Sequence, residues 1–126
     1  MGRMIEPQQV ALVVEDDPDI RELAATVLEE TDLKVVEASS AEEALHYLRD
    51  HAEEVALLFV DVRLPCLMSG VDLAKTVTSE WPWVRTILTS GAPLDSADDV
   101  PGDVRFVPKP WAAMDALVEA ERAVRT

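Results

Sequence analysis

The chain has 126 residues, with 11 Lys and Arg against 25 Asp and Glu, which gives a formal net charge of −14. A chain of this length buries a core without metals or disulfides, so we predict one domain over 1–126, with 1–8 as a flexible N-terminal segment. The acidic excess argues against direct binding of nucleic acid, because phosphate contacts need Lys and Arg. No apolar run approaches the length of a membrane span, which favours a cytoplasmic protein without a membrane partner.

Apolar runs typical of strands alternate with segments of helical periodicity. The expected strands are 10–14, 34–38, 56–60, 85–89 and 105–107. Helices are expected from Pro18, after Ser40, over 70–80 and over 112–125. This alternation indicates βαβ units and predicts an α/β fold. We expect a doubly wound (βα)₅ three-layer sandwich whose five-stranded parallel sheet has the order 2-1-3-4-5.

The helical segments differ in how clearly the sequence defines them. The first has an apolar stripe at the spacing of one buried helical face, formed by Ile20, Leu23, Ala24, Val27 and Leu28. The segment 92–103 contains two prolines, one glycine and four aspartates, with no basic residue between them. Because prolines break helices and like charges repel, we expect a short or poorly formed fourth helix with weak amide protection.

Polar side chains suited to phosphoryl chemistry stand where the expected strands end. Glu15 and Asp16 follow the first strand and Asp61 the third, while Thr89 ends the fourth and Lys109 follows the fifth. The ligand crevice of an open α/β sheet lies beyond these strand ends, so we expect the five side chains to converge. Repulsion among three carboxylates favours a hard divalent cation, Mg²⁺ or else Mn²⁺, and a lysine beside them suits a phosphoryl oxygen.

With these strand-end residues the chain resembles the receiver domain of two-component response regulators, and the resemblance extends from Val10 to Val124. The resemblance implies the flavodoxin-like fold and a phosphoacceptor function in signal transduction. Asp61, in the run Asp61-Val-Arg-Leu-Pro65, matches the aspartate that accepts a phosphoryl group from a histidine kinase or a histidine phosphotransfer protein. We therefore expect a phosphoacceptor that is not an enzyme, although it would promote its own phosphorylation and slow dephosphorylation.

The resemblance also implies the ligands of the metal ion. Glu15 and Asp16 match the acidic pair that binds Mg²⁺ together with Asp61, and the backbone carbonyl of Arg63 matches a further ligand. Two features depart from the family pattern. Glu15 stands where aspartate is commoner, and Cys66–Ser69 makes the following loop one residue longer than usual.

Three further matches concern the phosphorylated state. Lys109 matches the lysine that binds the phosphoryl group, Thr89 the hydroxyl switch residue, and Phe106 the aromatic residue whose rotamer reports activation. They imply that Thr89 moves inward on phosphorylation and vacates space for Phe106. The surface around the fourth and fifth strands would then change its affinity for a downstream protein.

Dimerisation is expected to be weak. A regular fourth helix completes the surface by which many receivers dimerise, so the breakers in 92–103 predict a monomer or a weak dimer. The last helix, with Met114, Leu117 and Val118, is then the expected contact element. Cys66 has no cysteine partner, and a neighbouring acidic cluster should raise rather than lower the pKa of a thiol, so we expect no redox role.

This interpretation has four alternatives. A degenerate receiver would bind proteins without being phosphorylated, but the full set of Asp61, Thr89 and Lys109 argues against it. The chain resembles a stand-alone regulator that acts by protein contact, and the alternative is a receiver excised from a larger regulator or hybrid kinase. A phosphatase that forms an aspartyl phosphate needs a second acid two residues after the nucleophile, where this chain has Arg63. A flavin-binding protein is disfavoured because the first loop is acidic and lacks phosphate-binding Ser, Thr and Gly donors.

Overall fold

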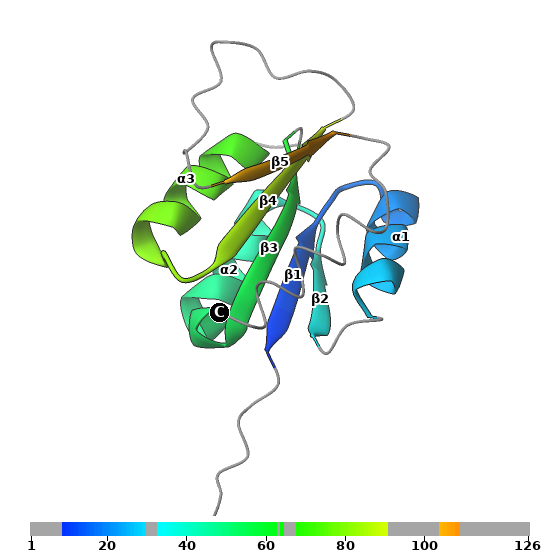
Figure 1. Cartoon of the computed structure of the whole chain (residues 1–126). Helices are drawn as coiled ribbons and strands as arrows, with labels where there is room; N and C mark the ends of the chain where they lie inside the picture. The colour runs from blue at the N-terminus through cyan, green and yellow to red at the C-terminus, as the bar shows by residue number, and fades with distance from the viewer. Residues whose placement is uncertain (1–8, 30–32, 63, 65–67, 91–103, 109–126) are drawn as a thin grey trace, which may run out of the picture.

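Five short apolar runs form the strands of one parallel sheet. The computed structural model describes residues 9–29, 33–62, 64, 68–90 and 104–108. Within these residues the strands pair in the order β2-β1-β3-β4-β5 (Figure 1). The strands are β1 (Val10–Val14), β2 (Lys34–Ala38), β3 (Val55–Asp61), β4 (Arg85–Ser90) and β5 (Arg105–Pro108).

Helices connect the first four strands. They are α1 (Pro18–Leu28), α2 (Ala41–His51), the 3₁₀ helix η1 (Ala52–Glu54) and α3 (Gly70–Glu80). Each α-helix begins beside a polar side chain that accepts backbone N–H groups of the first turn, and these caps are Asp17, Ser40 and Ser69. None of the helices in the described ranges is both long and apolar enough to cross a membrane.

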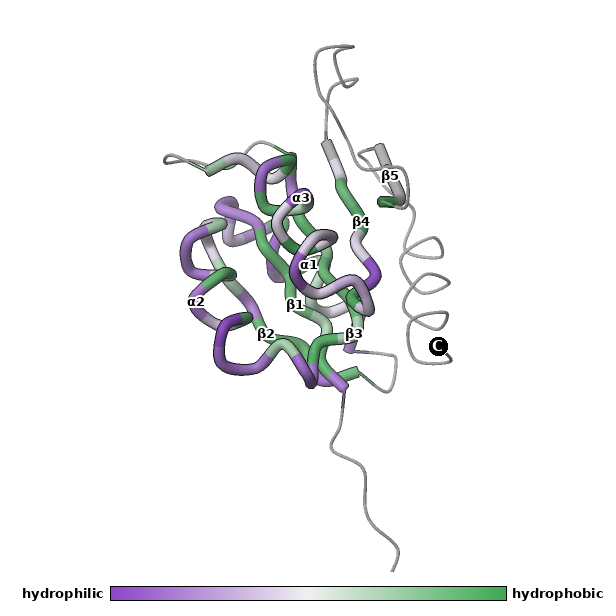
Figure 2. Tube along the Cα trace, turned by 90° about the vertical axis from the view of Figure 1, so that its left-hand side faces the viewer, coloured by the Kyte–Doolittle hydropathy of each residue, from purple (hydrophilic) through white to green (hydrophobic). Residues whose placement is uncertain are grey.

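The core lies in two layers, one on each face of the sheet. β1 and β3 are buried along their whole length, as central strands of a parallel sheet are when helices cover both faces. Alternate strand residues point to opposite faces. One set packs with α2 and α3, and the other packs with α1. Figure 2 shows the apolar strands inside and the more hydrophilic helical turns outside.

The predicted strand order is confirmed, and the sheet with its first three helices is the parallel α/β arrangement that was expected. Three strands end one residue later than predicted, β3 at Asp61, β4 at Ser90 and β5 at Pro108. The reason is that β3 pairs with β4 as far as Asp61, and β4 pairs with β5 as far as Ser90 and Pro108. The flexible start predicted for 1–8 and the helices predicted in 92–103 and 112–125 lie outside the described residues.

One predicted core residue is wrong. Leu23 is 56% exposed, whereas Ala24, Ala25 and Leu28 are buried. Successive residues of an α-helix are turned by about 100°. The buried face of α1 is therefore centred between Ala24, Ala25 and Leu28, and Leu23 lies on the opposite side of the helix. The apolar stripe in the sequence did not show which of its two flanks would face the sheet.

The start of α3 lies directly against the end of β3. The N–H of Gly70 donates to the carbonyl oxygen of Val62 at 2.9 Å. A Cβ atom at position 70 would overlap the carbonyl oxygen of Asp61 and would lie 2.8 Å from the Cα of Val62. Only a residue without a side chain fits here, because all of the nearest atoms belong to the backbone and cannot turn away.

The close contact at Gly70 makes a prediction about stability. Gly70→Ala should lower the free energy of unfolding by about 1–3 kcal/mol, since overpacking of this order displaces the backbone. Urea denaturation followed by circular dichroism measures the change. Ser79→Ala in the exposed last turn of α3 is the control and should change the free energy by less than about 0.5 kcal/mol. Equal unfolding midpoints for the two variants would contradict the steric argument.

Candidate functional site

The carboxyl ends of β1 and β3 form the point at which the strand order reverses. These two strands are neighbours, and the sheet continues from β1 to β2 on one side and from β3 to β4 on the other. Ligands of open α/β sheets bind at such a reversal. Glu15 and Asp16 follow β1 directly, Asp61 is the last residue of β3, and Thr89 pairs with Asp61 in register. The structure thus brings four of the predicted site residues to one edge of the sheet.

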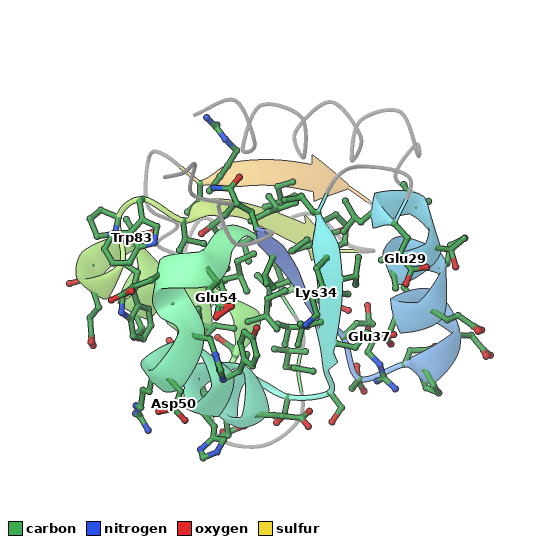
Figure 3. All side chains as sticks on the ribbon, turned by 90° about the horizontal axis from the view of Figure 1, so that it is seen from below. Glu29, Lys34, Glu37, Asp50, Glu54 and Trp83 are labelled. Carbon is green, nitrogen blue, oxygen red and sulfur yellow. The ribbon has the colours of Figure 1, made fainter. Side chains whose placement is uncertain are left out.

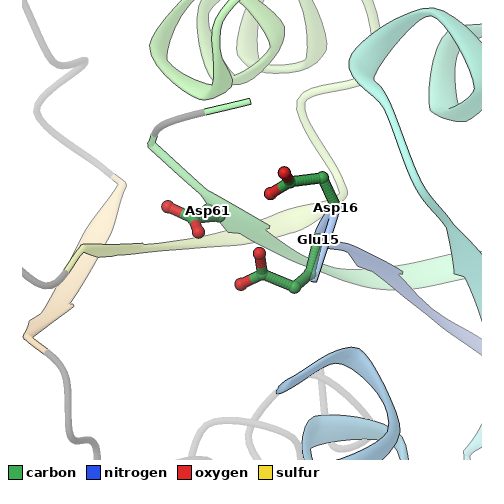
Figure 4. A group of neighbouring side chains, drawn as sticks. All are labelled: Glu15, Asp16 and Asp61. Atoms are coloured by element: carbon green, nitrogen blue, oxygen red, sulfur yellow. The ribbon is translucent and has the colours of Figure 1, made fainter. Parts of the chain in front are cut away.

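Three carboxylates form a compact cluster at this edge. One oxygen each from Glu15, Asp16 and Asp61 lies within 4.8 Å of the other two. Figure 4 shows the three side chains grouped at the ends of β1 and β3. Glu15 and Asp61 are only 4% and 6% exposed, while Asp16 is exposed to solvent. Two of the three acids are therefore buried, and the third is open to water. We call Glu15, Asp16 and Asp61 the acidic cluster.

The end of β1 is fixed by several hydrogen bonds. The N–H of Glu15 donates to the carbonyl oxygen of Ala38 at 3.1 Å, and the carbonyl oxygen of Glu15 accepts from Nη1 of Arg21 at 2.8 Å. Oε2 of Glu15 accepts from the backbone N–H of Asp17 at 3.2 Å. Asp17 caps the N-terminus of α1, where the helix dipole favours negative charge. The acidic cluster is therefore built on a constrained backbone beside a helix end that stabilises it.

The donor atoms of the acidic cluster fit a hard divalent cation. All three are carboxylate oxygens, which are the ligands that Mg²⁺ prefers. Buried carboxylates are costly unless an opposite charge or hydrogen bonds compensate them. Asp16 receives no hydrogen bond or ion pair from the part of the chain that the structure describes. Its exposed position also leaves room for the water molecules that Mg²⁺ usually retains.

Thr89 places a buried hydroxyl beside the acidic cluster. It is 1% exposed, and its Oγ1 has no hydrogen-bond partner among the described residues. An unsatisfied buried hydroxyl costs about 1–3 kcal/mol, so an oxygen that reached it would be bound favourably. The backbone carbonyl of Thr89 is already used, because it accepts from the N–H of Val62 at 2.8 Å.

The remaining predicted site residues are not tested by the structure. Arg63 and Lys109 lie outside the described residues, as does Cys66. The backbone of Phe106 belongs to β5 and pairs with Leu88, but the orientation of the Phe106 side chain is not described. The roles suggested for Arg63, Lys109 and Phe106 therefore stay predictions.

Sequence reasoning overlooked Arg21. Its side chain connects α1 with the end of β1 and also forms an ion pair with Glu37 of β2, at 3.1 Å between Nε and Oε1. Figure 3 shows Glu37 on the side of β2 that faces α1. A signal was present in the sequence, since Arg21 is the only basic residue between Val10 and Leu33, in a segment that holds several acidic residues.

Comparison with known proteins agrees with this geometry. Residues 11–120 match the family model of the response regulator receiver domain. Response regulator GtcR of Aneurinibacillus migulanus is 29% identical over 123 residues, which cover 90% of this chain and 47% of that protein. Nitrogen assimilation regulatory protein NtrX of Azorhizobium caulinodans is 31% identical, with 91% of this chain and 26% of that protein covered. The chain thus spans about half or less of the length of these relatives.

Solved structures give the same result for the fold. The response regulator receiver protein from Pseudomonas putida is 29% identical, and the alignment has a TM-score of 0.75 and covers 94% of this chain and 98% of that chain. The acidic cluster lies in the part of the chain that the family model covers. The chain belongs to the family of receiver domains found in response regulators of two-component systems.

Proposed function

We propose that this receiver domain is a cytoplasmic phosphoacceptor switch in which Asp61 accepts a phosphoryl group from the phosphohistidine of a histidine kinase or a phosphotransfer protein. The observation that carries the proposal is the acidic cluster, in which a buried Asp61 lies with two further carboxylates and beside the Thr89 hydroxyl. Membership of the receiver family supports the same reaction class.

The transfer moves one phosphoryl group between two protein side chains. A carboxylate oxygen of Asp61 forms a bond to phosphorus while the phosphorus–nitrogen bond of the donor histidine breaks, and the electron pair of that bond stays on the imidazole. A divalent cation held by Glu15, Asp16 and Asp61, with Arg63 supplying a carbonyl, would neutralise charge on the phosphoryl oxygens. Glu15 and Asp16 would hold this cation beside the reacting carboxylate.

Two side chains are proposed to contact the phosphoryl group on Asp61. The hydroxyl of Thr89 donates a hydrogen bond to a phosphoryl oxygen on Asp61, and Lys109 forms an ion pair with the same group. Turning of Thr89 toward Asp61 frees space that Phe106 occupies, and the surface near β4 and β5 changes with it. A downstream protein would bind that surface of a monomer or weak dimer, and the domain would lose the phosphoryl group slowly by hydrolysis.

The first prediction from the proposed function concerns the phosphoacceptor residue. Wild-type protein treated with acetyl phosphate and Mg²⁺ should gain about 80 Da, and Asp61→Asn should gain nothing, because the amide is a poor nucleophile. Intact-protein mass spectrometry measures the gain. Asp50→Asn, which removes an equal charge from an exposed site on α2, should be labelled like the wild type. Wild-type protein that remains unlabelled would favour a degenerate receiver, and labelling of Asp61→Asn would place the acceptor elsewhere.

The second prediction concerns the cation. Asp16→Asn should weaken Mg²⁺ binding by about tenfold or more, since a ligand oxygen loses its charge. Affinity should also fall as the pH becomes acidic, because protons compete with the metal for the same oxygens. Calorimetric titration tests both. Asp19→Asn changes the charge by the same amount on the exposed first turn of α1 and should keep wild-type affinity. Equal losses in both variants would indicate general electrostatics rather than ligation.

The third prediction concerns Thr89. Thr89→Val keeps the shape and removes the hydroxyl, so phosphorylation by acetyl phosphate should slow by roughly tenfold or more, as expected for the loss of one hydrogen bond to a charged group, about 1.5–3 kcal/mol. Unfolding free energy should not fall, because the hydroxyl has no partner within the described residues.

Thr86→Val is the matched control. Thr86 is 3% exposed on the same strand, and its hydroxyl likewise has no partner in the described ranges. It lies three residues before Thr89 and so faces the other side of the sheet. Thr86→Val should leave the phosphorylation rate unchanged. If the two variants slow the reaction equally, Thr89 has no special contact with the phosphoryl group.

A further inference from the structure

Arg21 forms two contacts that meet at the backbone of the acidic cluster. Its Nη1 donates to the carbonyl oxygen of Glu15 at 2.8 Å, and its Nε donates to Oε1 of Glu37 at 3.1 Å. The Arg21 side chain is only 22% exposed, and its own backbone N–H donates to the carbonyl oxygen of Asp17. One guanidinium group thus joins α1, the end of β1 and the edge strand β2.

The atom that Arg21 holds has a particular position. The carbonyl oxygen of Glu15 belongs to the peptide group between Glu15 and Asp16, and a peptide group is planar. Its orientation sets the last backbone torsion of Glu15 and the first of Asp16. The direction of the Asp16 side chain therefore depends on it directly, and that of Glu15 depends on it through the N–H of Asp17, which donates to Oε2 of Glu15. On the other side of Glu15, the N–H is held by Ala38 of β2.

We propose that Arg21 is a positioning residue for cation binding: by fixing the Glu15–Asp16 peptide it aims two of the three carboxylates at one cation. Glu37 orients the guanidinium for this task. The inference rests on the proposed function, since it concerns how the same site obtains its affinity for Mg²⁺. It adds a residue that binds neither the cation nor the phosphoryl group.

The charge of Arg21 and its positioning role predict opposite effects on Mg²⁺ affinity when Arg21 is replaced. Its positive charge lies near the acidic cluster and repels a cation, so removal of the charge alone should strengthen Mg²⁺ binding. That effect is at most a few-fold, because Glu37 already pairs with Arg21 and solvent reaches both side chains. Loss of a residue that orients metal ligands typically weakens binding by about 10–100-fold. The geometric effect should therefore exceed the electrostatic one and reverse its sign.

Arg21→Lys separates the two effects because the net charge does not change. A lysine has one ammonium group and cannot reproduce the forked contact with both Glu15 and Glu37. We expect Mg²⁺ binding by the full chain to weaken by about 3–10-fold in Arg21→Lys and by about 10-fold or more in Arg21→Gln. Arg49→Gln, on the exposed surface of α2, removes the same charge without these contacts and should bind Mg²⁺ within about twofold of wild type.

The role of Glu37 is tested by a double-mutant cycle. If Glu37 acts through Arg21, the variant carrying both Arg21→Gln and Glu37→Gln should bind Mg²⁺ as weakly as Arg21→Gln alone. The dependence of phosphorylation on Mg²⁺ gives a second measurement. A positioning role should raise the Mg²⁺ concentration at half-maximal rate in Arg21→Lys, while the rate at saturating Mg²⁺ stays close to wild type.

Urea unfolding shows whether each variant is folded, so that a loss of Mg²⁺ affinity in a folded variant reflects positioning rather than a merely structural role. Wild-type Mg²⁺ affinity in a folded Arg21→Lys, or tighter binding in Arg21→Gln, would overturn the inference and leave the proposed function intact. If Arg21→Gln does not fold, Arg21→Lys and Glu37→Gln still decide the question. Absence of Mg²⁺ binding by the wild type would overturn the proposed function, and the positioning role would fall with it.

Discussion

Repulsion among three carboxylates at one edge of the sheet is the constraint on which the site depends. One oxygen of each residue lies within 4.8 Å of the other two, and Glu15 and Asp61 are buried, where charge is costly unless hydrogen bonds or opposite charges compensate it. Such a group stays together only if the fold holds it. Here β1 and β3 do so, because both are buried along their whole length and pack on both faces. The stability of the core thus keeps the three carboxylates grouped at this edge of the sheet.

Backbone contacts connect this edge to the rest of the domain. The N–H of Val62 donates to the carbonyl oxygen of Thr89, and the N–H of Gly70 donates to the carbonyl oxygen of Val62. The ends of β3 and β4 and the start of α3 therefore form one hydrogen-bonded frame. Within that frame the Thr89 hydroxyl differs, since it is buried and has no partner among the described residues. If Asp61 is phosphorylated as proposed, a phosphoryl oxygen would contact this side chain first, because the neighbouring backbone groups already have hydrogen-bond partners.

The strands and the location of the site could be predicted from the sequence, since apolar runs are local and parallel strands place their carboxyl ends together. The grouping of Glu15, Asp16 and Asp61 followed from that rule. Two features could not be predicted. Periodicity did not show that Leu23 faces solvent, because that depends on how α1 rests on the sheet. It also did not show that Arg21 reaches Glu37, because the contact spans 16 positions and joins two elements. The assignments of Arg63, Lys109 and Phe106 remain predictions because their side chains lie outside the described residues.

Glu15 and Asp16 have different environments within the acidic cluster. Its long side chain reaches the backbone N–H of Asp17 while the carboxylate stays beside Asp61, so one of its oxygens is engaged and the residue is buried. Asp16 is exposed and has no partner among the described residues, so of the three carboxylates it is the one most accessible to the proposed cation. A side chain without contacts of its own takes its direction from the backbone. The peptide that Arg21 holds therefore matters most for Asp16, the residue with the fewest other constraints.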